Sequence, residues 1–185
     1  MLFPSLDNPG AVRHLVCLDL LTWSQAPADE ASAAAAGRIH NCRRIMAYGR
    51  SIGWTITHVF DHTARARRAR AIPGLEPLQI EPVLYRTGVS AFSNRIFRES
   101  VEESPEAQLV ILSLSLSPNC LATALAARDR GLAVALVEDV LMGSAGAAAG
   151  IDAIQTLSHS LAAPFVKILR TEDLIDVRRG LRVVS

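Results

Sequence analysis

The strongest constraint on the fold is a repeated alternation of short apolar runs with longer segments of helical period. Six runs are candidate strands, at 14–20, 54–60, 82–86, 107–116, 132–139 and 165–170. Their continuous hydrophobicity is typical of strands that are buried on both faces. Candidate helices lie between them at 30–52, 91–103, 119–130 and 147–162. The pattern predicts an α/β fold with three layers and a mostly parallel sheet of about six strands.

Length and composition limit the class of protein further. A chain of 185 residues that is 50% apolar fits one domain over 1–185 with a sizeable core. The net charge of +1 gives no general field for nucleic acid or acidic membranes, and the arginine-rich stretch 63–71 is interpreted as a solvated loop. No signal peptide or membrane span is expected. Three cysteines, at 17, 42 and 120, have no metal-ligand spacing and favour a reducing compartment, so we expect a cytoplasmic protein.

Polar residues follow the apolar runs, at the sheet edge where parallel sheets form ligand sites. Asp19 ends the first run and Arg86 the third, and polar residues also follow the second, fourth and fifth runs. A carboxylate within an apolar strand end is costly unless it is paired or functional. Asp19 is therefore interpreted either as a carboxylate that caps a loop or as an acid or base of a site.

Three stretches resemble the isochorismatase-like cysteine hydrolases. VCLDLLTW (16–23) is similar to that family's first strand with its catalytic aspartate, and residues 41–60 are similar to its first crossover. The most specific stretch is EPVLYRTGVSAFSNRIF (81–97), in which Arg86 occupies the place of a catalytic lysine before Ser-Ala-Phe. The resemblance covers nearly the whole chain and implies a Rossmann-type fold, a hydrolase that acts on a small molecule, and no cofactor.

The resemblance implies an Asp, Lys and Cys triad, in which a thiolate attacks a carbonyl, the aspartate moves the proton and the lysine stabilises charge. Asp19 then takes the place of the aspartate and Arg86 that of the lysine. Arginine keeps the positive charge but does not release its proton. We expect Asp19 and Arg86, at the ends of two candidate neighbouring strands, to form a hydrogen-bonded ion pair.

The position of the nucleophile depends on a register of one residue. In the family's pattern the nucleophile lies four residues before a Thr-Ala pair and twelve before a glycine, and Thr123 and Gly131 both select Asn119. Cys120 is then one position too late, and one helical step turns a side chain by about 100°. We expect Asn119 to point at Asp19 and Cys120 to be a packed thiol. The alternative is a local deletion that returns Cys120 to the site.

Other expectations depend on this site. Ser117, Trp23 and Phe92 are candidate ligand-binding residues, although core packing is the alternative for the two aromatic side chains. No metal site is expected, because His58 and His62 lie too far apart along an extended strand to share an ion. The altered triad leaves two hypotheses: a hydrolase of this family, or a non-catalytic relative that keeps the fold for ligand binding or assembly. Ala-rich apolar helices favour a homo-oligomer.

Overall fold

The computed structural model describes residues 13–22, 33–63, 68–105, 107–141 and 166–175. Six parallel strands form one sheet: β1 (Arg13–Leu18), β2 (Thr55–Asp61), β3 (Val83–Arg86), β4 (Gln108–Leu112), β5 (Val134–Val137) and β6 (Lys167–Leu169). The helices are α1 (Ala33–Ser51), α3 (Arg95–Glu102), α4 (Pro118–Asp129) and the short α6 (Thr171–Leu174), with 3-10 turns η3 (Ala91–Ser93) and η4 (Glu138–Val140). The predicted α/β class and parallel sheet are confirmed.

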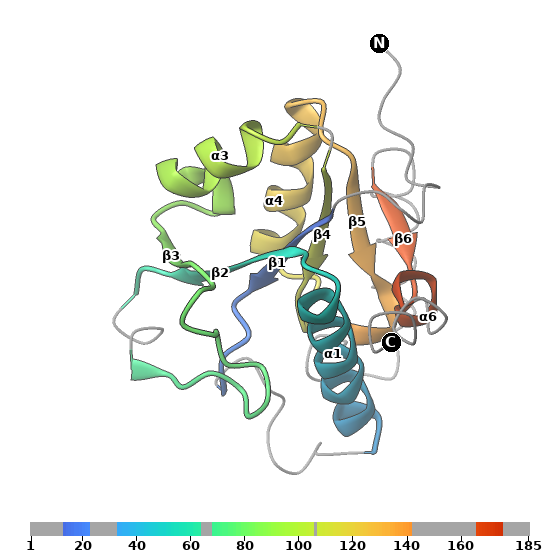
Figure 1. Cartoon of the computed structure of the whole chain (residues 1–185). Helices are drawn as coiled ribbons and strands as arrows, with labels where there is room; N and C mark the ends of the chain where they lie inside the picture. The colour runs from blue at the N-terminus through green and yellow to red at the C-terminus, as the bar shows by residue number, and fades with distance from the viewer. Residues whose placement is uncertain (1–12, 23–32, 64–67, 106, 142–165, 176–185) are drawn as a thin grey trace.

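The strand order is β3-β2-β1-β4-β5-β6. The chain adds β2 and β3 on one side of β1 and then returns to add β4 on the other side (Figure 1). The order therefore reverses between β1 and β4. Ligands of open α/β sheets bind outside the carboxyl ends of the strands at such a reversal, which directs attention to the residues that follow β1 and β4.

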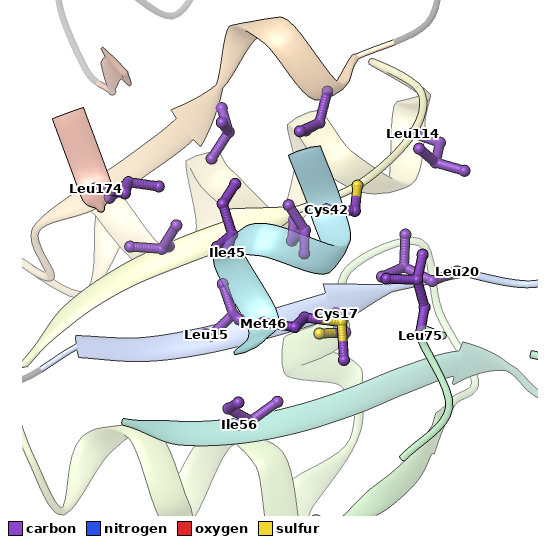
Figure 2. Packing of buried hydrophobic residues seen from close by; sticks show 14 of the residues in the cluster. Leu15, Cys17, Leu20, Cys42, Ile45, Met46, Ile56, Leu75, Leu114 and Leu174 are labelled. Atoms are coloured by element: carbon purple, nitrogen blue, oxygen red, sulfur yellow. The ribbon is translucent and has the colours of Figure 1, made fainter. Parts of the chain in front are cut away.

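Alternate residues of β1 face two separate cores. Leu15 and Cys17 pack with α1 and α6, whereas Val16 and Leu18 pack with α3 and α4. Figure 2 shows part of the first core, with Ile45 and other α1 side chains over β1. The sheet is thus the middle of three layers, and the burial of both its faces explains why its strands are apolar throughout.

Glycine follows the ends of two of the helices. Gly53 follows α1 with φ 76°, and Gly131 follows α4 with φ 75°. Glycine has no Cβ and adopts this left-handed conformation without strain, so it ends a helix readily. At the other end of α4, Ser117 caps the helix by accepting the N–H of Cys120, and Pro118 occupies the first helical turn, where it loses no hydrogen bond.

Several predicted boundaries are wrong in detail. The helix expected over 91–103 is interrupted, because the side chain of Asn94 caps a new helix by accepting the N–H of Phe97 and also donates to the carbonyl of Tyr85. The predicted strand 107–116 ends at Leu112, and 132–139 gives way to η4 after Val137. Apolar residues continue beyond the last hydrogen bonds of both strands, so composition does not mark where β4 and β5 end. The predicted helix 147–162 lies outside the described residues.

One polar network ties the segment before β3 to α1. Glu81 accepts hydrogen bonds from Arg50 at 2.8 and 2.9 Å and from the N–H of Leu78 at 2.9 Å, and its Oε2 lies 3.0 Å from Nε2 of His58. Burial alone would raise the pKa of Glu81, but these partners lower it to about 2. His58 thus belongs to a structural network of hydrogen bonds around Glu81.

Two further findings concern the described part of the chain. Within it, no helix is long and apolar enough to cross a membrane. Every described strand belongs to the one sheet. The single domain over 1–185 stays a prediction, because it includes residues outside the described ranges.

Candidate active site

Asp19 is the first residue after β1 and has an unusual backbone. Its φ is 51°, a left-handed value that aspartate tolerates better than most residues. Its N–H donates to the carbonyl of Val59 at 3.1 Å, and its Oδ1 accepts the N–H of Asp61 at 3.0 Å. Both contacts come from β2, so the end of the neighbouring strand fixes the direction of the carboxylate. Backbone strain of this kind gathers at functional sites.

Arg86 forms the predicted ion pair with Asp19. Its Nη2 donates to Oδ2 of Asp19 at 2.8 Å, in a buried contact. The expectation that the two strands are neighbours is wrong, because β2 lies between β1 and β3. The pair forms across β2 because an arginine side chain is long enough to pass over the end of that strand.

Asp61, at the end of β2, is a member of this site that the sequence interpretation did not single out. Its Oδ2 lies 2.9 Å from the same Nη2 of Arg86, and its Oδ1 accepts the N–H of Thr63 at 2.9 Å. One guanidinium nitrogen therefore contacts two carboxylates. The available signal was its place directly after the second apolar run, 54–60, because Asp19 likewise stands at the end of the first run.

Asn119 lies at the second position of α4 and points toward Asp19. Its Nδ2 is 3.5 Å from Oδ2 of Asp19, a long hydrogen bond. Its backbone carbonyl accepts the hydroxyl of Thr123 at 2.7 Å, and the same hydroxyl oxygen accepts the N–H of Ala91 at 3.0 Å. Thr123 thus holds the Ser-Ala-Phe segment against the first turn of α4. Asn119 therefore points at Asp19, as expected, whereas its place in the register of the family's nucleophile stays a prediction.

Cys120 lies on another face of α4. Its side chain is 0% exposed and packs in the core with Ala124 and Ala127, in agreement with the expected packed thiol. Burial raises the pKa of the Cys120 thiol to about 12, and the negative charge of Asp19 adds to the shift, against a hydrogen bond with Ser113. The thiolate is the nucleophile of cysteine enzymes, and this environment disfavours it.

The three candidate ligand-binding residues have different outcomes. Phe92 is buried in the core under α3 and α4, where its ring lies 5.1 Å from that of Phe97 and beneath the guanidinium of Arg130, so the alternative of core packing applies to it. Ser117 is half-buried and its hydroxyl caps α4. Trp23 lies outside the described residues. Ligand binding by Ser117 and Trp23 stays a prediction.

Asp139, in η4 after β5, holds elements together through hydrogen bonds outside this cluster. Asp139 accepts the N–H and the hydroxyl of Thr171 through Oδ1, at 3.0 and 2.9 Å, and the amide of Asn41 through Oδ2 at 3.2 Å. It thereby ties α6 and α1 to the end of β5. Among the described residues, no group of three His, Cys, Asp or Glu side chains is arranged to hold a metal ion.

The cluster of Asp19, Asp61, Arg86 and Asn119 offers charge and hydrogen bonds but no thiol. Asp19 accepts hydrogen bonds from three N–H groups, those of Asp61, Arg86 and Asn119. An amide such as that of Asn119 cannot form a covalent acyl intermediate.

Comparison with known proteins gives several solved structures with a similar fold. Similar solved structures include an isochorismatase from Pseudomonas putida (22% identity, 91% of this chain and 94% of that chain, TM-score 0.75). Others are an isochorismatase family protein from Burkholderia thailandensis (15%, 98% and 100%, 0.73) and the N-carbamoylsarcosine amidase from Thermoplasma acidophilum (15%, 87% and 97%, 0.67).

At these identities the solved structures support the fold alone. Comparison with curated proteins gives no match. The isochorismatase domain family, however, matches residues 15–173, which is most of the chain and includes every residue of the cluster. On this evidence the chain belongs to the isochorismatase family.

Proposed function

We propose that this protein binds a small molecule at the cluster of Asp19, Asp61, Arg86 and Asn119 and that it lacks the cysteine-dependent hydrolase activity that the family resemblance implies. One observation carries the proposal: Asn119 occupies the position next to Asp19, and the thiol of Cys120 is buried in the core. It is a non-catalytic relative that keeps the fold and the charged site.

The substitution of lysine by Arg86 supports the loss of turnover. A lysine in this place can release a proton to a reacting group, whereas a guanidinium does not. Arg86 is also held by three partners, since Nη2 contacts Asp19 and Asp61 and Nη1 donates to the carbonyl of Gly88 at 3.0 Å. It is therefore fixed as a counter-ion and is not free to follow charge that develops in a reaction.

A cleavage that uses Asp19 as a general acid, without a covalent intermediate, is the second candidate function. It requires a protonated Asp19 that donates a hydrogen bond to the leaving group. The three described side-chain contacts of Asp19, one of them its ion pair with Arg86, are all with N–H donors, so its carboxyl group donates to none of these partners. We therefore place this activity second.

The experiment is alkylation of the folded protein with iodoacetamide near neutral pH, followed by peptide mass mapping. We expect Cys120 to react slowly in the folded protein and quickly after unfolding in urea, because its thiol is buried and its pKa is raised. Rapid labelling of Cys120 that Asp19→Asn abolishes would show an activated thiol and overturn the proposal. The control is Asp129→Asn, the same change at the far end of α4.

We also propose a homo-oligomer. Several large apolar side chains on and beside the edge strand β3 are exposed, namely Leu78, Ile80, Val83, Tyr85 and Val89. Exposed apolar groups that lie together are typical of protein interfaces. The proposed partner is a second copy of this chain. We also propose a cytoplasmic location, because the three cysteines are free and buried.

A further inference from the structure

The hydrogen-bond donors of the site are engaged within the cluster or buried. The Arg86 side chain is 3% exposed, its Nη2 contacts both carboxylates and its Nη1 donates to the carbonyl of Gly88. Its Nε is buried and has no partner among the described residues. The amide nitrogen of Asn119 faces Asp19. An anionic ligand would therefore meet a guanidinium that presents no N–H group to solvent.

The acceptors of the site are more open. The Asp61 side chain is 28% exposed, whereas that of Asp19 is 10% exposed. A carboxylate has room for about four hydrogen bonds, and Asp61 uses Oδ2 for Arg86 and Oδ1 for the N–H of Thr63. The amide nitrogen of Asn119 faces Asp19. The other polar atom of this amide, Oδ1, is also an acceptor.

The formal charge of the cluster agrees with this account. Two carboxylates, Asp19 and Asp61, stand against the single guanidinium of Arg86, which leaves one negative charge. That charge acts in a half-buried setting, where electrostatic interactions are stronger than in water. A ligand that supplies N–H donors and a positive charge satisfies both the open acceptors and the excess charge.

We infer that the ligand group bound at this site is an organic cation, such as an ammonium, amidinium or guanidinium group, and that Asp61 determines this preference. The inference rests on the proposed function, because it names the class of ligand for the same site. Carboxylate ligands are disfavoured, since the only cation of the cluster is enclosed by its own counter-ions. Exposed Arg68 and Arg70, which follow this strand end, are the described cations that would act against the preference.

Three probes of one shape separate charge from size: benzamidine is a cation, benzamide is neutral and benzoate is an anion. The experiment follows the amide NMR signals of Asp61, Thr63 and Asn119 in the full-length protein while each probe is added. We expect benzamidine to bind about tenfold more tightly than benzoate, or better, and to shift these three signals. Added salt should weaken the binding of benzamidine and leave the binding of benzamide unchanged.

Asp61→Asn should reduce the affinity for benzamidine by about tenfold, because a charged hydrogen-bond partner is lost. The matched control is Glu99→Gln, which removes the same charge from the exposed surface of α3 and should leave binding unchanged. Benzoate binding at these signals as tightly as benzamidine would overturn the inference and leave the proposed binding site standing. Binding of none of the three probes would contradict both. Rapid alkylation of Cys120 would contradict the proposed function alone.

Discussion

The amide nitrogen of Asn119 lies 3.5 Å from Oδ2 of Asp19, and Asn119 is the residue that the family resemblance selects for the position of the nucleophile. Cys120, the next residue, is directed into the core under α4. A single helical step of about 100° separates the two environments. The described contacts of Asp19 therefore include an amide, whereas the thiol of Cys120 is buried in the core.

Asn119→Cys should create a reactive thiol. The new side chain stands in the first turn of α4, where the helix dipole and the charge of Arg86 favour a thiolate, although Asp19 opposes it. We expect iodoacetamide to label position 119 at least about tenfold faster than Cys120. Ala122→Cys, on the same helix beyond its first turn, is the control. Equal rates at positions 119 and 120 would show that the register is wrong.

Arg86→Met should destabilise the fold. It leaves Asp19 and Asp61 without their shared cation, and an uncompensated buried charge costs about 3 kcal/mol. Arg86→Lys keeps the charge and should lower the free energy of unfolding by less. Urea unfolding measures the free energies, and Arg95→Met, which removes an exposed pair with Glu99, should change stability by less than about 1 kcal/mol. Equal losses for Arg86→Met and Arg95→Met would refute a structural role of the ion pair.

Acid should weaken the fold through His14. Burial lowers the pKa of His14 from 6.5 to about 4, and the neutral ring lies 2.8 Å from the hydroxyl of Thr57. The unfolded chain binds the proton first as pH falls, so stability decreases from about pH 6.5 down to about pH 4. A shift of this size corresponds to about 3 kcal/mol. His14→Gln should flatten this part of the pH dependence in urea unfolding, whereas the exposed His40→Gln should not.

The apolar residues around β3 should contribute to self-association. Ile80 is 88% exposed, and Val83 and Tyr85 project from the edge strand beside it. Light scattering at micromolar concentration should give the mass of an oligomer, and Ile80→Lys should lower that mass because a charge is buried at the interface. Leu125→Lys, an exposed position on α4, is the control. A monomer mass for the unmodified protein would exclude the proposed homo-oligomer.

Much of the fold follows from local pattern. Buried parallel strands must be apolar on both faces, so continuous runs such as the one that ends at Asp19 mark them, and glycines such as Gly53 mark helix ends because only they adopt a left-handed backbone freely. Local pattern does not mark the ends of strands, since apolar residues continue beyond the paired region after Leu112. The helix start at Asn94 is not evident from the sequence either, because the side chain of Asn94 also donates to the carbonyl of Tyr85, nine residues away.

The sequence by itself determined the class of fold, the family resemblance, and the register that places Asn119 and not Cys120 beside Asp19, because helical period and landmark spacing are local properties of the chain. Only the tertiary structure decided that Asp61 joins the site and that Arg86 reaches Asp19 across β2. Strand order depends on which runs pair in three dimensions, and no local pattern records it. The charge of the site, two carboxylates around one guanidinium, is for that reason a property of the fold.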